Sequence, residues 1–255
     1  MKDLLLSFDV EEFDLPLELG LDISKDEMFN IGYIGLIEVL QMLDDKKATF
    51  FVSCEFAKKY SDLIRDISEK HEVALHCLKH SDDYSKMSDE EFRENIKEGK
   101  RILEKIIGKE VVGFRSPRMQ KLRYNVLKEL GFIYDSSYNP IYMPGRYNNF
   151  FGTRNLFYKD NVLVIPCTAI PIFRIPLFWL TFRNFGLLFA RLFFFLSFQN
   201  YINLYFHPWE FTDLKELKLP WYVKRNTGDK VLNNLNQYIQ NYNLITFSDF
   251  VKKVH

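Results

Sequence analysis

Short apolar runs alternate with longer amphipathic segments along the whole 255-residue chain. This alternation is typical of parallel strands joined by crossover helices. The chain is long enough for seven or eight such strand–helix units, which favours a closed or nearly closed α/β barrel and one domain over residues 1–255. The predicted strands cover residues 4–8, 48–52, 72–75, 111–114, 132–134, 162–165, 201–206 and 244–246.

The clearest predicted helix covers residues 88–107. Ser88 and Glu91 form the S-x-x-E pattern of a capping box, and Gly108 supplies a stop. A second helix over residues 122–130 ends in the same way at Gly131. The segment 138–160 is rich in Asn, Tyr, Pro and Gly, and we expect it to be a long loop over one face of the barrel.

Composition excludes several classes of protein. Lysine plus arginine equals aspartate plus glutamate, at 34 each, so no overall field attracts nucleic acid. Cys54, Cys77 and Cys167 are scattered, which argues against a disulfide framework or a zinc knuckle and fits a reducing compartment. The apolar stretch at the N-terminus is too short for the core of a signal peptide, so we expect a cytoplasmic protein.

Polar side chains directly follow five predicted strands. The carboxyl ends of barrel strands converge on one rim, where catalytic groups collect. We therefore expect these side chains to be neighbours in space: Asp9, His76, Arg115, Asp135 and His207.

His76 and His80 are four residues apart, which places both imidazoles on one side of a helical turn and within reach of one metal ion. An isolated H-x-x-x-H pattern more often marks two unrelated histidines. The acidic run from Asp9 to Glu12 favours the metal site, because carboxylates that end an apolar strand are costly unless they are exposed or used. One of them could complete a His/His/carboxylate site with open positions for water.

His207 and Arg115 each have a structural alternative. His207 could be a core histidine that bonds a backbone carbonyl. Arg115 ends a buried-looking strand and needs a carboxylate partner, for which Asp9 is the natural candidate. That pair could also be a barrel-closing ion pair without a catalytic role.

At these residues the sequence resembles the polysaccharide deacetylase family, also called carbohydrate esterase family four or the chitooligosaccharide deacetylase homology domain. The resemblance implies a distorted (β/α)7 barrel and a hydrolase that acts on carbon–nitrogen bonds other than peptide bonds. Five segments resemble the family's motifs in the family's order: SFDVEEF, HCLKH, GFRSPRM, GFIYDSS and YFHPWEF.

The resemblance also implies roles for individual residues. Asp9 matches the general base, His76 and His80 the metal ligands, Arg115 the residue that holds the base, and His207 the general acid. Asp135 is expected to hold His207.

Two positions depart from the family's pattern. Where the family has an adjacent Asp-Asp pair, this chain has Asp9-Val10-Glu11, so Glu11 becomes the expected carboxylate ligand, as in a D-x-E branch. Arg118 replaces a frequent tyrosine, so its backbone N–H is the expected oxyanion contact. Trp209 is a predicted substrate contact. The implied cofactor is a divalent metal, with Zn favoured over Co, Ni, Mn or Fe.

The segment between Ile175 and Phe198 is unusually rich in Phe and Leu. It is about long enough to span a bilayer, but its polar residues argue against a simple spanning helix. On a helical wheel four of them fall on one side, which predicts an amphipathic helix: Arg183, Asn184, Arg191 and Ser197. The helix either packs on the barrel with its polar stripe outward or lies in a membrane interface as a peripheral contact at the inner face.

Three classes of function follow. The first is removal of an N-acyl group, acetyl or formyl, from an amino sugar in a cell-envelope polysaccharide or lipid-linked precursor. The second is hydrolysis of a cyclic amide or ureide by an allantoinase- or imidase-like enzyme, and the third is glycan binding by an inactive barrel. The Tyr- and Asn-rich loop suits a sugar, and a binding module needs no acid together with a base, so the first class is favoured. The sequence leaves the oligomeric state open.

Overall fold

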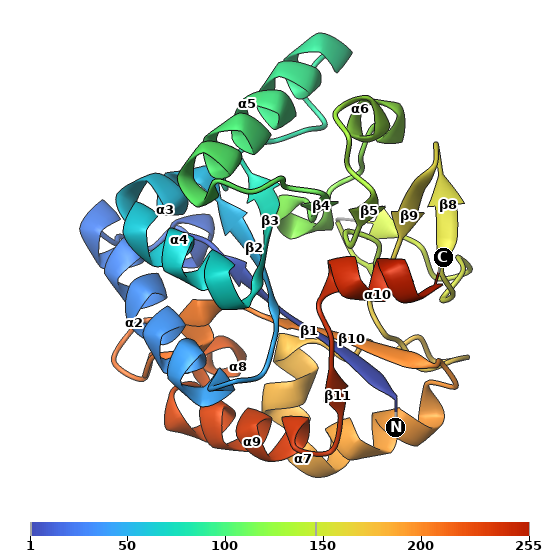
Figure 1. Ribbon diagram of the computed structural model, residues 1–255. Coiled ribbons are helices and arrows are strands. Elements are labelled where there is room, and N and C mark those ends of the chain that lie inside the picture. Colours follow the sequence, from blue (N-terminus) through green and yellow to red (C-terminus); the bar gives the residue numbers. More distant parts are fainter. Residues whose placement is uncertain (1, 146, 255) are drawn as a thin grey trace.

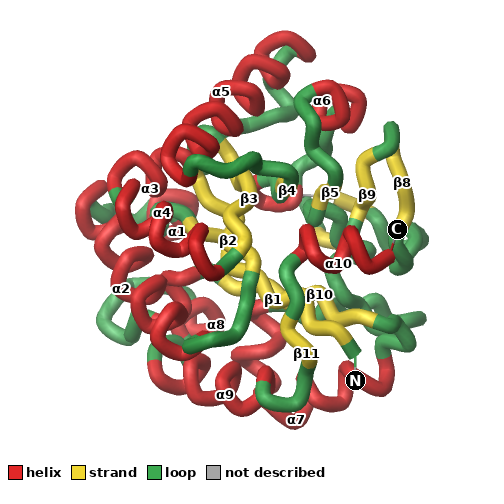
Figure 2. Tube along the Cα trace, viewed as in Figure 1, coloured by secondary structure: helices red, strands yellow, loops and turns green. Residues whose placement is uncertain are grey.

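The computed structural model describes residues 2–145 and 147–254, which form a curled sheet with most helices packed around its outer side (Figure 1). The strands lie in the order β10-β1-β2-β3-β4-β5-β9-β8, and β11 pairs with β1. Neighbouring strands are parallel except for β8, which is antiparallel to β9. Figure 2 shows the strands as a curved wall surrounded by helices. The predicted distorted α/β barrel is confirmed.

The strands are β1 (Asp3–Val10), β2 (Thr49–Ser53), β3 (Glu72–Cys77), β4 (Gly113–Phe114), β5 (Tyr134–Asp135), β6 (Tyr142–Met143), β7 (Tyr147–Asn148), β8 (Phe157–Lys159), β9 (Val162–Val164), β10 (Tyr201–Phe206) and β11 (Asn243–Leu244). The helices are α1 (Leu15–Glu18), α2 (Lys25–Leu43), α3 (Cys54–Lys59), α4 (Ser61–Lys70), α5 (Asp89–Ile107), α6 (Tyr124–Glu129), α7 (Trp179–Leu196), α8 (Trp221–Lys224), α9 (Asp229–Ile239) and α10 (Phe247–Val254), with the 3-10 helices η1 (Pro117–Met119) and η2 (Pro208–Phe211).

Every predicted strand is present within a few residues of its expected position. Helix α5 begins with the expected capping box, in which Ser88 Oγ accepts from the Glu91 N–H and the Glu91 carboxylate accepts from the Ser88 N–H. It ends at Gly108, whose φ of 67° is the left-handed conformation that glycine adopts easily. Helix α6 likewise ends just before Gly131.

The segment predicted as a long loop contains three short strands. In the hairpin of β6 and β7, Tyr142 pairs with Asn148 and Met143 with Tyr147. Gly145, with a φ of 75°, lies in the turn between them. β8 then adds an edge to the main sheet. The expected long loop thus contains strands that were not predicted, because strands of two or three residues are too short to show a period.

The strand path ends at β8 and β10, and the described residues form no strand ladder between β10 and either β8 or β9. Asn203 of β10 spans this gap, because its side-chain amide donates to the carbonyls of Ile165 and Pro166, both at 3.2 Å. Its backbone N–H also donates to Thr168 Oγ1 at 2.9 Å. The N–H of Thr168 donates to the carbonyl of Asn203 at 3.4 Å, so the gap is joined by the side chains of Asn203 and Thr168 and by one backbone hydrogen bond.

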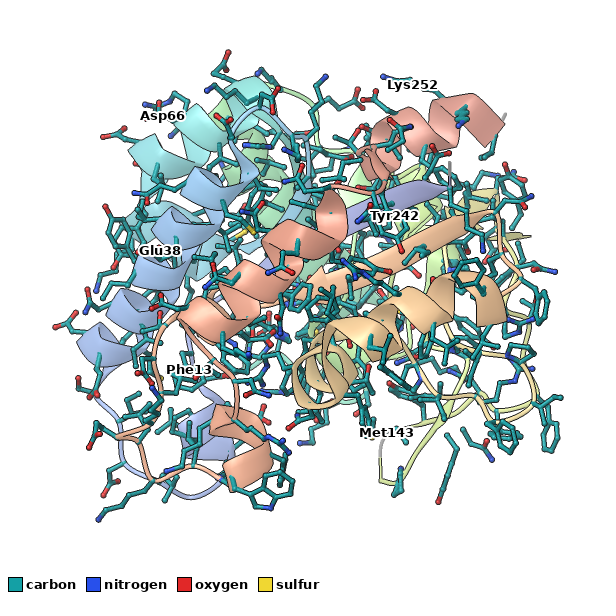
Figure 3. All side chains as sticks on the ribbon, turned by 90° about the horizontal axis from the view of Figure 1, so that it is seen from below. Phe13, Glu38, Asp66, Met143, Tyr242 and Lys252 are labelled. Carbon is teal, nitrogen blue, oxygen red and sulfur yellow. The ribbon has the colours of Figure 1, made fainter. Side chains whose placement is uncertain are left out.

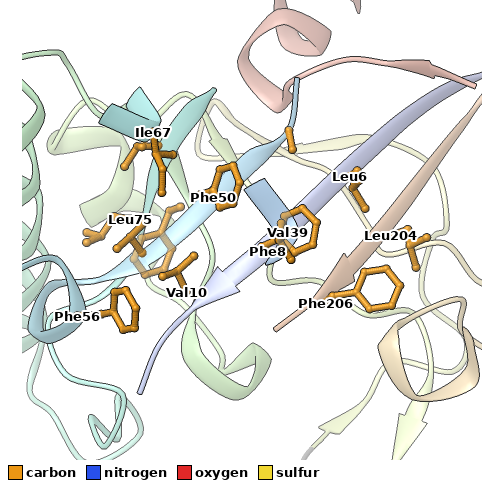
Figure 4. Packing of buried hydrophobic residues seen from close by; sticks show 14 of the residues in the cluster. Leu6, Phe8, Val10, Val39, Phe50, Phe56, Ile67, Leu75, Leu204 and Phe206 are labelled. Atoms are coloured by element: carbon orange, nitrogen blue, oxygen red, sulfur yellow. The ribbon is translucent and has the colours of Figure 1, made fainter. Parts of the chain in front are cut away.

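Alternation along the strands divides their side chains between an outer and an inner environment. On the outer side, Leu6, Phe8 and Val10 of β1 pack with strand and helix residues such as Phe50 and Val39 (Figure 4). The inner side receives the residues between them. The same parity in β3 and β10 directs His76, Asn203 and His207 inward.

Helix α10 covers the inside of the curled sheet at the amino ends of its strands. Phe247 and Phe250 pack there with Leu5, Phe51 and Tyr134, all in one cluster of buried residues. Figure 1 shows α10 lying across the opening of the curl. With this end filled by apolar side chains, the inner polar groups lie toward the carboxyl ends of the strands.

Helix α7 reverses the orientation predicted for most of its polar residues. It lies beside α9, below β1 and β10 in Figure 1, and both helices are seen from below in Figure 3. Arg183 is fully buried and pairs with Glu210, and Asn184 donates to the carbonyls of Leu180 and Tyr222. Ser197 is buried, Arg191 is exposed, and the other exposed side chains include Phe185, Leu188, Leu192, Phe195 and Leu196. The predicted outward polar stripe was therefore wrong for Arg183, Asn184 and Ser197, because a buried carboxylate and backbone carbonyls draw Arg183 and Asn184 inward.

Candidate active site

The carboxyl ends of the strands bring six predicted site residues together inside the curl. The parity of the strands explains their common direction, since Asp9 and Glu11 are two residues apart and therefore lie on the same face. We call this set the rim residues: Asp9, Glu11, His76, His80, Arg115 and His207. All are buried or nearly so.

Glu11, His76 and His80 form a candidate metal centre. Their ligand atoms all lie within 4.8 Å of one another. Glu11 Oε2 is 3.1 Å from His76 Nε2 and 2.9 Å from His80 Nε2. Two imidazole nitrogens and a carboxylate oxygen are the ligand types of catalytic zinc sites, which keep a further position open for water. The residues present therefore fit a divalent metal.

The opposite nitrogen of each imidazole is held by a neighbour. His76 Nδ1 lies 2.8 Å from the backbone carbonyl of Arg115, and His80 Nδ1 lies 2.8 Å from Asp14 Oδ2. Hydrogen bonds of this kind orient ligating histidines and select the tautomer that leaves Nε2 free to bind. Asp14 was not predicted, because it lies in the loop beyond β1 and only the path of that loop brings it to His80.

Burial and charge act against each other on Glu11. Desolvation raises its pKa, but the positive charges of His80 and His207 and the hydrogen bonds of His76 and His80 hold the pKa well below its ordinary value. A buried carboxylate that stays ionised marks a place where positive charge is bound. This electrostatic environment agrees with the ligand geometry.

Asp9 and Arg115 form a buried ion pair, with Arg115 Nη1 2.7 Å from Asp9 Oδ1. The guanidinium also donates to Ser7 Oγ and to the carbonyl and hydroxyl oxygens of Ser136. Its Cζ atom lies 4.1 Å from the centre of the Phe51 ring. Arg115 is thus fixed on every side, and it fixes Asp9 in turn.

His207 is held by Glu210, not by Asp135 as expected from the sequence. His207 Nδ1 lies 3.1 Å from Glu210 Oε1, and its Nε2 points toward Glu11 Oε1 at 3.9 Å. Glu210 Oε2 in turn lies 2.7 Å from Arg183 Nε, and both of these side chains are fully buried. Burial lowers the pKa of His207, but Glu11 and Glu210 outweigh it and raise that pKa above its ordinary value.

Asp135 bonds residues of its own neighbourhood. Its carboxylate accepts from Tyr124 Oη at 2.9 Å and from the N–H and hydroxyl of Ser137. The expected contact with His207 is therefore wrong. A signal for the real partner lay in the HPWE segment, where η2 returns the side chain of Glu210 to His207 three residues earlier.

Two aromatic residues pack against the His207 ring. Trp209 stacks on it at a centroid distance of 5.1 Å, and Trp179 contacts it edge to face at 5.5 Å. Trp209 is only 3% exposed, so the structure places it as a support of His207 instead of the predicted substrate contact. Trp179 is half-buried and was not predicted as part of the site.

The turn after β4 places Arg118 at the edge of the site. Its φ is 54°, as is that of Met119, so both residues adopt the left-handed conformation. The guanidinium pairs with Glu18 and lies 3.7 Å from Asp14, the residue that holds His80. The predicted role of its backbone N–H as an oxyanion contact stays a prediction.

A cleft of about 980 Å³ adjoins this turn. Its lining includes Arg118 and Met119 from the turn and Ser137, which accepts from the Ser116 N–H. The rest is rich in tyrosines and cations: Tyr84, Lys121, Arg123, Tyr124, Tyr138, Tyr147 and Lys159. Tyrosine rings and hydroxyls suit the apolar faces and hydroxyl groups of a sugar.

Residues 29–134 match the family model of polysaccharide deacetylases. No curated protein sequence matches the chain. Among solved structures, the fold is similar to a putative polysaccharide deacetylase from Mycobacterium smegmatis, with a TM-score of 0.70 and 17% identity over 99% of this chain and 89% of that one. PuuE allantoinase gives a TM-score of 0.67 and 16% identity over 99% and 90% of the two chains. A pseudoenzyme of carbohydrate esterase family four from Bacillus anthracis gives 0.57 and 15% over 98% and 65%.

The likenesses to solved structures show the fold, and the family match adds the chemistry. The family match indicates a hydrolase that acts on carbon–nitrogen bonds other than peptide bonds. The resemblance to the polysaccharide deacetylase family is confirmed by the match over residues 29–134. The D-x-E branch stays a prediction.

Proposed function

We propose that the chain removes an N-acyl group, acetyl or formyl, from an amino sugar in a polysaccharide or lipid-linked precursor, with a divalent metal as cofactor. The observation that carries the proposal is the convergence of a metal triad with a held base and a held acid. Asp9 pairs with Arg115 at 2.7 Å, and His207 lies 3.1 Å from Glu210. A site that only binds glycan has no need of this arrangement.

Glu11, His76 and His80 would hold the metal, and zinc is the first candidate because the ligands are nitrogen and oxygen atoms. When bound, such an ion polarises the substrate carbonyl and lowers the pKa of water. The Nδ1 contacts with Arg115 O and Asp14 keep both histidines aimed at one point.

The remaining steps fall to the side chains of the chain itself. Asp9 accepts the proton of the attacking water, and Arg115 keeps that carboxylate oriented. Attack produces a tetrahedral oxyanion, for which the Arg118 N–H is the proposed donor. His207 gives its proton to the departing amine nitrogen, while Glu210 stabilises the charged imidazole through Nδ1.

The substrate is proposed from the cleft that adjoins the Arg118 turn at the edge of the site. Its tyrosines offer stacking surfaces for sugar rings, and Lys121 and Lys159 add positive charge at its wall. Such a lining suits an extended N-acylated glycan better than a small cyclic amide, which is usually enclosed. We place the reaction on the cytoplasmic side, in cell-envelope glycan assembly.

The experiment is release of acetate or formate from a panel of N-acylated amino sugars, measured with and without chelator. Asp9→Asn and His207→Ala should abolish release yet retain metal, whereas His76→Ala should lose both. His71→Ala is the matched control, because His71 packs on Phe50 away from the metal centre and should keep metal and activity. Chelator-insensitive hydrolysis of a cyclic imide, with no release from any sugar, would contradict the proposal.

A further inference from the structure

The outer side of α7 is mostly apolar, and the helix is kinked at Gly186, where φ is 78° and ψ is −174°. After the kink, Leu188, Leu192 and Phe195 recur at three- and four-residue spacing, which places them in one stripe, and Phe185 is exposed before the kink. The four side chains are 82%, 49%, 69% and 64% exposed in that order. We call this stripe, together with Phe185, Phe198 and the loop residues Ile172 and Phe173, the α7 apolar face. Contiguous exposed apolar surface of this kind marks a site of interaction with a partner or a membrane.

The inner face of the same helix is already fully used. Phe182 packs on Phe206 and Tyr238, and the carbonyl of Ala190 accepts from the Tyr238 hydroxyl. Arg183 pairs with Glu210, and its Nη1 donates to the carbonyls of Val223 and Arg225. Rotation of α7 to hide its apolar face would break this buried pair, so the outer side chains stay exposed.

The loop before α7 extends the same surface. Arg154 Nη1 donates to the carbonyls of Ala169 and Ser197, which ties the start of that loop to the end of the helix. Ile172 and Phe173 are 79% and 74% exposed, and Phe198 is 78% exposed. Apolar side chains from two segments therefore contribute to this side of the molecule.

The charge around the α7 apolar face is positive and uncompensated. Residues 161–209 contain three arginines and no acidic residue. Arg183 is buried, but Arg191 is exposed and lies three residues after Leu188 and four before Phe195, at the border of the stripe. Within residues 2–145 and 147–254, neither Arg174 nor Arg191 forms an ion pair. Cations that border an aromatic surface complement the anionic headgroups of a lipid leaflet.

We propose that the α7 apolar face docks the protein on an anionic lipid surface, with its Phe and Leu side chains in the acyl boundary and the exposed Arg191 at the headgroups. No described helix is long and apolar enough to cross a membrane, so the helix lies along the interface. Docking itself does not depend on the deacetylase activity proposed above. Its value for a lipid-linked sugar does rest on that activity, because α7 begins at Trp179, in contact with His207.

Flotation with vesicles tests the docking. The full chain should float with vesicles of phosphatidylcholine and phosphatidylglycerol and much less with phosphatidylcholine alone, and added salt should weaken binding. Leu188→Ser and Phe195→Ser should each weaken partitioning about tenfold, because each removes a large apolar side chain from the interface. Arg191→Gln should reduce binding to the anionic vesicles alone.

Ile34→Ser is the matched control, since Ile34 is an aliphatic residue of α2 that is 41% exposed and lies outside the α7 apolar face. It should float like the unaltered chain. Thermal unfolding of each variant shows that it is folded. Two results overturn the proposal: no flotation of the unaltered chain, or a dimer in sedimentation that Leu188→Ser dissociates while vesicle binding is absent. Acyl release from a water-soluble sugar by the unaltered chain tests the proposed function separately.

Discussion

The rim residues and the α7 apolar face depart from the usual distribution of side chains in opposite directions. At the rim, ionisable groups are buried and each has a partner, such as Arg115 with Asp9. On α7, large apolar side chains are exposed to solvent. Each arrangement is costly by itself, so both mark places where function overrides folding preference.

Helix α5 shows that the fold itself does not demand an apolar surface. It has nearly the length of α7 and also covers the sheet, yet its exposed side carries ion pairs at i,i+3: Glu90–Arg93, Glu94–Lys97 and Glu98–Arg101. Packing decides which face of each helix turns inward. Packing does not fix the outward side chains, and these differ between the helices: ion pairs on α5 and mostly apolar side chains on α7.

The largest effect on stability is expected at the rim. Arg115→Leu leaves Asp9 buried without its cation, so the free energy of unfolding should fall by about 3–5 kcal/mol. Urea unfolding measures it. A loss below about 1 kcal/mol would mean that water reaches Asp9 and that the rim is not the buried environment described above.

The second largest effect on the free energy of unfolding is expected from removal of the metal. A cation that binds only the folded chain and is present at about 100 times its dissociation constant adds roughly 3 kcal/mol to the free energy of unfolding. Calorimetry with and without chelator should show this loss. The chelator should have no effect on His76→Ala, and an unchanged shift there would place the cation elsewhere.

Asp135 should make the free energy of unfolding depend on pH. Burial raises its pKa from 3.8 to about 6, so the folded chain holds this proton more tightly than the unfolded chain. The stability that protonation contributes is fully present below pH 3.8 and is lost as pH rises through about 6, a change on the order of 2–3 kcal/mol. Asp135→Asn should flatten the unfolding free energy between about pH 4 and 6. An identical profile in the variant would rule out Asp135 as the titrating group.

Glu210→Gln tests the link between the two regions, because Glu210 contacts both His207 and Arg183 of α7. The loss of its charge should lower kcat about 10–100-fold, as is usual when a partner that orients a functional histidine is changed. KM and metal content should stay the same. If kcat does not change in the folded variant, His207 is positioned by Trp209 and Trp179 alone.

The smallest effect is expected on the outer face of α7. Leu188→Ala should change the free energy of unfolding by less than about 0.5 kcal/mol, since Leu188 makes few contacts. Phe193, on the same helix, is 1% exposed, and Phe193→Ala should cost about 3–5 kcal/mol. Equal losses in the two variants would contradict the assignment of inner and outer faces.

Much of the fold could be predicted because the information is local. A buried parallel strand is apolar on both sides, so β1, β2, β3 and β10 stand out in the sequence, and polar residues at the carboxyl ends of β1, β3 and β10 mark the rim. The two-residue strands β6 and β7 could not be found in this way. The chemical roles of the rim residues stay predictions, since geometry places them together without measuring turnover.

The missed contacts join residues that only the folded chain brings together. Glu210 follows Arg183 by 27 residues, and their pairing depends on how α7 packs against η2. A helical wheel treats Arg183 as a solvent-seeking residue because it contains no information about the neighbouring carboxylate. The sequence likewise does not show that η2 returns the side chain of Glu210 to His207, so Asp135 was expected as the partner of His207.

The gap spanned by Asn203 has an evolutionary consequence. A backbone ladder transmits register, so a change in one strand shifts its neighbours. A seam joined by the side chains of Asn203 and Thr168 and by one backbone hydrogen bond fixes register at a single point only. The intervening stretch between Pro166 and Tyr201, α7 included, is thus free to diverge in length and character among barrels of this design, while β10 keeps His207 in place through its register with β1.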